Sequence, residues 1–449
     1  MAQAFSLHAG AAESFNRRAN DILQRVAEAS RDARRAVPQP RVGSAAHVPV
    51  VAVIQPTDVI GDVVGRAEDI EGRLVELTFE VGGKVMVLGT EGCSAADDLK
   101  AVVLSRRELG GACSGRFVES VIVEWLKQRL AGGHERTWVE FFLEHLSAAV
   151  KDLPFRVPLE GIMIETPFDI GPYRVGYLTD ADVGELAAKV PEPHRNAALE
   201  KYKKHYQGKV CVCGTVTAEP SRVVERALEA AEDVVRALRF VHPGAFELLI
   251  RCDVGVYGRV LMPSWHVILG HGQAARASAG TDELAPPFEV RRGDLEVLDQ
   301  LGLAAVSAYL NSKEPSQLQQ RAWSALGVFT RGIELGSWKD KVINGLVAAE
   351  TLLLKNETEP IQQSLGLRMA RMLGENLEDR KTLKANVQFA YQARSRFMHH
   401  GRDMFAKEDR EKLNAALRAC HLVILNCLST KNADTVEALV ALLEDELLK

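Results

Sequence analysis

An arginine and two histidines that can act on a phosphodiester lie close together in the stretch YQARSRFMHHG, which begins at Tyr391. Arg394 occupies a helical apolar stripe between Tyr391 and Met398, where an aliphatic residue is expected. Arginine is rarely buried without a partner, so this position predicts an ion pair or a polar site. His399 and His400 follow it, and an imidazole can carry a proton near neutral pH.

These residue types are sufficient for cleaving RNA without a metal ion or another cofactor. A ribose 2′-hydroxyl would attack its own phosphate, His399 or His400 would move the proton, and Arg394 would stabilise the developing charge. In an unbroken helix, Arg394 and His399 are about 140° apart around the axis. The chemistry therefore favours a helix that ends near residues 397–400, where Gly401 is a natural C-terminal cap.

Two further charged residues occupy apolar helical stripes in the same region. Glu350 follows Ile343 and Leu346, and Arg368 lies between apolar positions on another predicted helix. An unpaired buried charge costs several kcal/mol, so such residues pair with one another or line a polar cleft. For Glu350 and Arg368 we prefer a structural ion pair to a catalytic role.

The elements that must position these residues are all helical. From about residue 290 onward, apolar residues recur at intervals of three and four. The predicted helices cover residues 294–312, 317–335, 338–355, 361–374, 383–398 and 410–429. Their spacing predicts an antiparallel helical bundle with short connections.

The preceding sequence mixes short apolar runs with helical patterns. Predicted strands cover residues 48–54, 73–81, 84–88, 101–105, 159–166, 173–178, 209–217 and 246–262, and predicted helices cover 10–36, 116–131, 136–151 and 220–239. Glycines at 82 and 83 predict a hairpin. The expected fold class is mixed: an exposed or docking helix and linker at 1–45, an α+β sensing or regulatory domain at 46–285, and an all-α bundle at 286–449.

Composition excludes several other classes of protein. The 449 residues are 47% hydrophobic and 26% charged, which is typical of a soluble globular protein. A net charge of −5 gives no overall attraction for nucleic acid, so any such site must be a local basic patch. The N-terminus lacks the pattern of a signal peptide, and no apolar run is long enough to span a membrane. We therefore expect a cytoplasmic protein.

Seven scattered cysteines do not form a disulfide framework, which predicts reduced thiols. Cys211 and Cys213 alternate within a predicted strand, so both sulfurs should lie on one face. With Cys252 or His205 they could form a metal site, but core thiols are the simpler interpretation, and we predict no metal ion.

Several segments resemble one known family. Residues 394–399 match the Arg-x4-His signature of HEPN domains, and the longer stretch is similar to the Tyr-x-x-Arg-Ser-x-x-x-His-Gly form of Apea-like HEPN domains. Residues 347–354 (VAAETLLL) and 365–374 (LGLRMARMLG) resemble two further helices of that family. The resemblance covers roughly residues 290–445. His400 departs from it, because the family usually has a small residue there, and this leaves open which imidazole would act.

The resemblance implies a helical domain that dimerises and brings two Arg-x4-His motifs into a shared cleft. Many such domains are metal-independent ribonucleases that serve as prokaryotic toxins or antiviral effectors. Arg394 would then bind phosphate, His399 would be the acid and base, and Ser395 would be the polar residue after the arginine. Glu350, Arg368 and Tyr391 would support them.

Two functions follow as expectations. The first is an RNA-cleaving homodimer with an unknown trigger ligand at its N-terminal domain. The second is a non-catalytic protein in which Arg394 pairs with Glu350 and the bundle serves only for dimerisation or RNA binding.

Overall fold

The computed structural model describes residues 5–29, 63–68, 74–133, 136–258, 264–269, 275–280, 286–356, 358–400 and 407–445. The chain has a mixed fold, with antiparallel sheets and helices in the N-terminal region and packed helices over residues 317–445. It divides into two compact units. Unit 1 comprises Met1–Pro154 with Thr215–Arg226, and unit 2 comprises Phe155–Gly214 with Ala227–Lys449. The predicted linker at 38–46 and strand at 48–54 lie outside the described residues.

Unit 1 combines an antiparallel sheet with helices. Its elements are α1 (Ala9–Gln24), β1 (Val26–Glu28), β2 (Val63–Glu68), β3 (Leu74–Val81), β4 (Lys84–Leu88), α2 (Thr90–Leu104), α3 (Arg107–Ala112), α4 (Gly115–Leu130) and α5 (Trp138–Ala149). The strand order is β1-β4-β3-β2. The predicted hairpin between β3 and β4 is confirmed. Gly82 and Gly83 both have positive φ, at 56° and 78°, as a two-residue type I′ turn requires.

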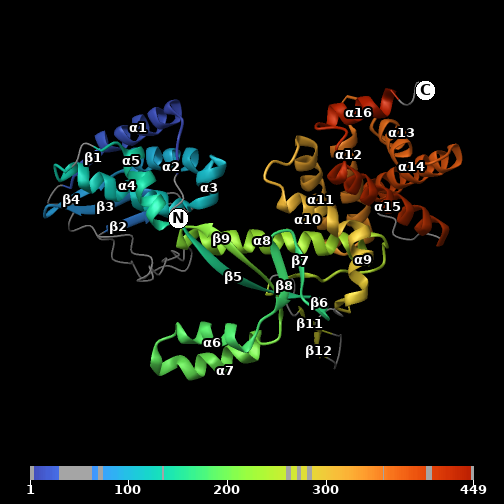
Figure 1. Ribbon diagram of the computed structural model, residues 1–449, viewed down its shortest axis with the longest axis horizontal. Coiled ribbons are helices and arrows are strands. Elements are labelled where there is room, and N and C mark those ends of the chain that lie inside the picture. The colour runs from blue at the N-terminus through green and yellow to red at the C-terminus, as the bar shows by residue number, and fades with distance from the viewer. Residues whose placement is uncertain are drawn as a thin grey trace. The chain divides into compact units, whose positions relative to one another are not determined.

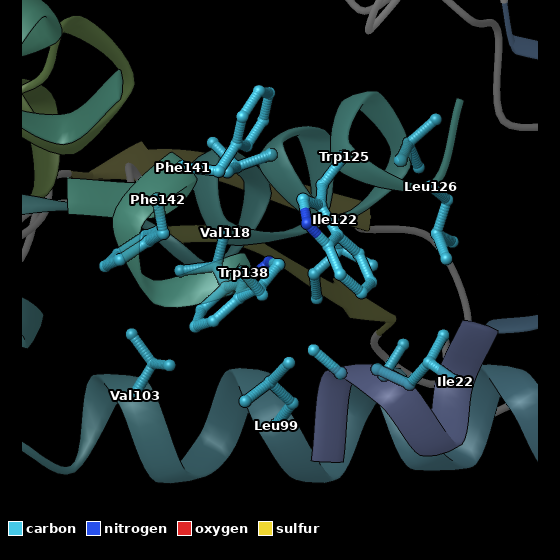
Figure 2. Close-up of a cluster of buried hydrophobic side chains, with 14 of the residues drawn as sticks. Ile22, Leu99, Val103, Val118, Ile122, Trp125, Leu126, Trp138, Phe141 and Phe142 are labelled. Carbon is cyan, nitrogen blue, oxygen red and sulfur yellow. The ribbon is translucent and has the colours of Figure 1, made fainter. Parts of the chain in front are cut away.

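The core of unit 1 lies between α2 and the pair α4 and α5. Figure 2 shows side chains of α4 and α5 pointing toward Leu99 and Val103 of α2. Trp138 stacks on Phe142 with ring centroids 4.8 Å apart. Phe15 of α1 is fully buried against the same Trp138. The first helix is therefore part of this core, and the helix predicted over 10–36 is too long, because α1 ends at Gln24 and strand β1 follows.

The strand predicted at residues 101–105 is wrong, because Thr90–Leu104 forms helix α2. The apolar run in this segment suggested a strand. Four buried residues spaced by threes and fours nevertheless lie on one helical face: Cys93, Ala96, Leu99 and Val103. Tertiary packing of that face outweighs the β-propensity of the adjacent valines.

The middle of the chain contains a five-stranded sheet. The elements from residue 151 to residue 290 are β5 (Lys151–Glu160), β6 (Ile162–Ile164), β7 (Phe168–Ile170), β8 (Tyr173–Tyr177), α6 (Asp180–Ala188), η3 (Glu192–His194), α7 (Arg195–Tyr206), β9 (Val210–Ala218), α8 (Pro220–Val241), η4 (Pro243–Ala245), β10 (Gly255–Val256), β11 (Ser264–Leu269), β12 (Ala275–Gly280) and β13 (Phe288–Val290). The sheet order is β10-β5-β9-β8-β7. Strands β8 and β9 and helix α8 match the predictions for 173–178, 209–217 and 220–239.

The long strand predicted at 246–262 is wrong over most of its described length. Only Gly255–Val256 forms a strand there, and it pairs with β5. The preceding loop is held by a side chain from the bundle, because the Lys341 ammonium donates to the carbonyls of Gly244, Glu247 and Ile250. These carbonyls are satisfied without a neighbouring strand.

Residues 292–445 form the C-terminal bundle, coloured yellow to red in Figure 1. Its elements are η5 (Arg292–Asp294), α9 (Leu295–Leu298), η6 (Asp299–Leu303), α10 (Ala304–Asn311), α11 (Gln317–Leu335), α12 (Trp338–Leu353), α13 (Ile361–Leu373), α14 (Leu377–His400), α15 (Lys407–Ser429) and α16 (Val436–Asp445). Helices α11, α12 and α15 pack against one another, and α14 packs against α13 and α15. The helices predicted over 317–335, 338–355, 361–374, 383–398 and 410–429 are found, whereas the one predicted over 294–312 is broken at Gly302, which has a φ of 119°. No helix within the described ranges is both long and apolar enough to cross a membrane.

Two buried histidines of unit 2 make its stability sensitive to acid. The His421 ring stacks on Phe240 at 4.0 Å. Burial lowers the pKa of His421 to about 3 and the pKa of His242 to about 4. An exposed histidine in the unfolded chain has a pKa of about 6.5. Below that pH the two histidines are protonated in the unfolded state but remain neutral in the native state. Stability should therefore fall as the pH decreases from 6.5 toward 4.

We expect each of these histidines to cost roughly 2 kcal/mol of unfolding free energy between pH 7.5 and pH 5. Urea unfolding at the two pH values measures the total. His421→Leu should reduce the difference by about one histidine's share, whereas His205→Gln, on the surface of α7, should leave it unchanged. An unchanged pH difference in His421→Leu would contradict the assignment.

Candidate functional site

The candidate site lies where α12 and α14 pack together. The Arg394 Nη1 donates to Glu350 Oε1 at 3.0 Å, and the Tyr391 hydroxyl donates to the same oxygen at 2.6 Å. The Arg394 side chain is 32% exposed and that of Glu350 is 19% exposed. One carboxylate oxygen on α12 thus receives two donors that are three residues apart on α14, which is the spacing that puts them on one helical face.

Tyr391 and Arg394 are different kinds of donor to Glu350. Burial, followed by the hydrogen bond to Glu350, raises the pKa of Tyr391 well above its ordinary value, so its phenol is a neutral donor at physiological pH. The Arg394 guanidinium also lies 6.0 Å from the centre of the Tyr391 ring. Its contact with Glu350 uses one of five N–H donors. The partly exposed guanidinium can therefore accept an anion such as phosphate while Glu350 holds it.

Arg368 belongs to a different cluster, in spite of its similar place in the sequence pattern. It is buried and donates to the carbonyl of Leu353 at 2.6 Å. It also pairs with Glu359 at 2.8 Å and with Glu444 of α16 at 2.7 Å. These contacts join α13, α16 and the α12–α13 connection. Arg368 thus has the structural ion-pair role preferred for it, with partners other than Glu350.

The remaining predicted residues follow Arg394 on the same helix. Ser395 is exposed. The α-helix continues to His400, so the backbone positions of Arg394 and His399 are about 140° apart around the axis. The side chains of 396–400 and the whole of Gly401 lie outside the described residues. The described cluster therefore consists of Glu350, Tyr391 and Arg394.

The structure also places the cysteine pair and the two residues suggested as its metal-binding partners. Within the described ranges, no group of three or more His, Cys, Asp or Glu residues has the geometry to hold a metal ion. Cys252 is buried elsewhere in unit 2, and His205 is exposed on α7. Cys211 and Cys213 do lie together, as their alternation predicted, with 3.4 Å between their sulfurs.

Comparisons of the chain with protein-family models, curated proteins and solved structures gave no significant match. The candidate site is therefore interpreted from its own geometry and chemistry.

One polar residue with a large structural role was missed by the sequence reasoning. Lys341 of α12 is 1% exposed, and its ammonium donates to three backbone carbonyls. A signal was present, because Lys341 precedes Gly345 by four residues and Ala349 by eight, on the buried face of the helix. Burial lowers the pKa of Lys341 to about 8, so it remains mainly cationic at neutral pH.

Unit 1 contains a groove that bears on the expected sensing role of the N-terminal region. This groove, on α4 and α5, has a volume of about 230 Å³ and is lined by Phe117, Ser120, Val121, Val123, Glu124, Lys127 and His145. Pockets for small-molecule ligands usually exceed roughly 300 Å³. The groove therefore gives little support for a trigger ligand at this position.

Proposed function

We propose that the chain is a metal-independent endoribonuclease of the HEPN type, which cleaves RNA by attack of a ribose 2′-hydroxyl on the adjacent phosphate. The observation that supports it is the partly exposed guanidinium of Arg394, which pairs with Glu350 of α12. Arg394 lies on α14, the helix that also carries His399 and His400. An oriented arginine and an imidazole of ordinary pKa are residue types that suit a reaction in which charge develops on phosphate oxygens.

Each member of the cluster has a role in this proposal. Arg394 binds a non-bridging phosphate oxygen through the donors that Glu350 does not use. Glu350 fixes the guanidinium, and Tyr391 fixes Glu350 by donating to the same oxygen. His399 or His400 takes the proton from the 2′-hydroxyl and returns one to the leaving oxygen. Ser395 is a polar neighbour of the bound phosphate.

The family resemblance adds a second copy of the chain to the proposal. Two Arg-x4-His motifs would share one cleft, so that Arg394 of one protomer could act with an imidazole of its partner. Such an arrangement would remove the difficulty that Arg394 and His399 are about 140° apart on one helix. The physiological role would be that of a prokaryotic toxin or antiviral effector.

The decisive experiment is gel-resolved cleavage of total RNA and tRNA by the full chain in EDTA. We expect fragments with 2′,3′-cyclic phosphate ends from the wild type and at least about 100-fold slower cleavage by His399→Ala and His400→Ala together. The single variants then identify the acting imidazole. Wild-type cleavage that requires Mg²⁺, or cleavage that survives loss of both histidines, would refute the mechanism.

A non-catalytic bundle is the second candidate, and one contact favours it. The Arg394–Glu350 ion pair already joins α12 to α14, which is sufficient reason for an arginine on that stripe. In this case the chain dimerises or binds RNA without cutting it. RNA that is retained in a gel-shift assay but left intact, across a range of added nucleotides and metal ions, would favour this candidate.

A further inference from the structure

A pair of thiols on strand β9 differs chemically from every other cysteine of the chain. Cys211 and Cys213 are two residues apart on one strand, so their side chains lie on the same face of the sheet. Their sulfurs are 3.4 Å apart and share a hydrogen bond. The residue paired with Cys211 on β8 is Gly176, which places no side chain over that thiol. The two sulfurs are thus adjacent and aligned.

The other five cysteines are buried and have no second thiol beside them: Cys93, Cys113, Cys252, Cys420 and Cys427. Burial raises the pKa of each of these thiols, so they are protonated and inert at neutral pH. Cys213 is the one cysteine with a partly exposed side chain. It combines solvent access with a neighbouring thiol, whereas Cys211 is completely buried.

Two arginines, each paired with an aspartate, lie near Cys213. Arg174 is its cross-strand partner on β8, and Arg156 lies on the neighbouring strand β5. The hydrogen bond from the Cys211 thiol lowers the pKa of Cys213, and both arginines lower it further, whereas burial and the Asp182 carboxylate oppose them. Asp182 is itself held by Arg156 at 3.4 Å. Cys213 is therefore the thiol in this chain that most readily forms a thiolate.

We propose that Cys213 and Cys211 form a reversible redox site, in which Cys213 reacts with a hydroperoxide and Cys211 resolves the product as a disulfide. In the first step the Cys213 thiolate attacks a peroxide oxygen. An S–O bond forms and the O–O bond breaks; hydroxide leaves hydrogen peroxide, or alkoxide leaves an organic hydroperoxide, and is protonated to water or an alcohol. In the second step the Cys211 sulfur attacks Cys213, forming the S–S bond, and the sulfenic hydroxyl leaves with the Cys211 thiol proton as water.

Disulfide formation has a structural cost at this position. Cα atoms two residues apart on a strand are separated by about 6.6 Å, near the upper limit at which a disulfide closes. Closure therefore distorts β9 where Cys211 and Cys213 pair with Gly176 and Arg174 of β8. A disulfide that distorts its sheet is readily reduced by a cellular dithiol, so the modification is reversible.

The test uses the full chain at pH 7 with a small excess of hydrogen peroxide, followed by alkylation and mass spectrometry of the tryptic peptide 210–222. The wild type should lose two hydrogens from this peptide, and dithiothreitol should restore them. Cys211→Ser should accumulate a sulfenic acid at Cys213 that reacts with dimedone. Without peroxide, iodoacetamide should alkylate Cys213 roughly tenfold faster than any other cysteine.

Two controls make the result decisive. Cys252→Ser removes a buried thiol of the same unit and should leave oxidation of the peptide unchanged. Arg174→Gln removes a neighbouring charge and should slow the alkylation of Cys213 severalfold without removing either thiol. The proposal is overturned if Cys213 in the wild type is alkylated no faster than the buried cysteines, or if peroxide yields no disulfide within 210–222.

Discussion

Replacing Arg394 with alanine should slow RNA cleavage by about 100-fold or more while the protein stays folded. The guanidinium is the one described cation of the α12–α14 cluster, so its loss removes the group that would stabilise charge on the phosphate. The contribution of Arg394 to the free energy of unfolding is modest by comparison, because its side chain is 32% exposed and solvent partly screens the ion pair. Cleavage in EDTA and thermal unfolding, measured on the same preparation, separate the two effects.

A variant of the partner residue distinguishes a catalytic from a structural ion pair. Glu350→Gln keeps the acceptor for Tyr391 and Arg394 but removes the negative charge. If Glu350 only orients the arginine, cleavage should fall by roughly tenfold and not disappear. The matched control is Arg321→Ala, an exposed arginine on α11, which should cleave normally. Equal losses of stability and dimerisation in Arg394→Ala and Glu350→Gln, together with a wild type that leaves RNA intact, would support the non-catalytic bundle.

The largest effect on stability is expected from Lys341→Met. Methionine fills much of the same volume but leaves one buried and two partly buried carbonyls without their donor: Gly244 and Glu247, each at 3.0 Å from the ammonium, and Ile250. A buried polar group that loses its partner costs about 1–3 kcal/mol, so we expect a total loss of about 3 kcal/mol or more. Guanidinium chloride unfolding measures it as a lower transition midpoint.

The control for this substitution is an exposed lysine of the same bundle. Lys381 on α14 pairs only with Glu378 one turn away, and its side chain is 61% exposed. Lys381→Met should change the unfolding free energy by less than about 0.5 kcal/mol. Equal midpoints for the two variants would show that the carbonyls near Lys341 find other partners.

The helices of the bundle could be predicted from the sequence because each one buries a stripe of its own. Helix α11 shows this most clearly, since it covers Gln317–Leu335, the predicted residues. It begins at Ser316 with a capping box to Gln319 and ends at Gly336 in the left-handed region. Periodicity, cap and stop signals agree there, so local information is sufficient.

Features that depend on distant residues could not be predicted. The loop after α8 resembles a strand in composition, yet its carbonyls are satisfied by Lys341, more than ninety residues along the chain. The partners of Arg368 could not be predicted either, because Glu444 lies on α16, which was not among the predicted helices. At the candidate site, by contrast, the pairing of Arg394 with Glu350 was among the predicted alternatives, and the structure contains this ion pair.

The division of the chain into units has a consequence for any attempt to dissect it. The polypeptide passes between the two units at residues 154–155, 214–215 and 226–227. These positions lie within β5, β9 and α8, not in linkers. A single proteolytic nick at any one of them therefore divides at least one unit between two fragments. Deleting residues from either terminus cannot yield one complete unit without residues of the other.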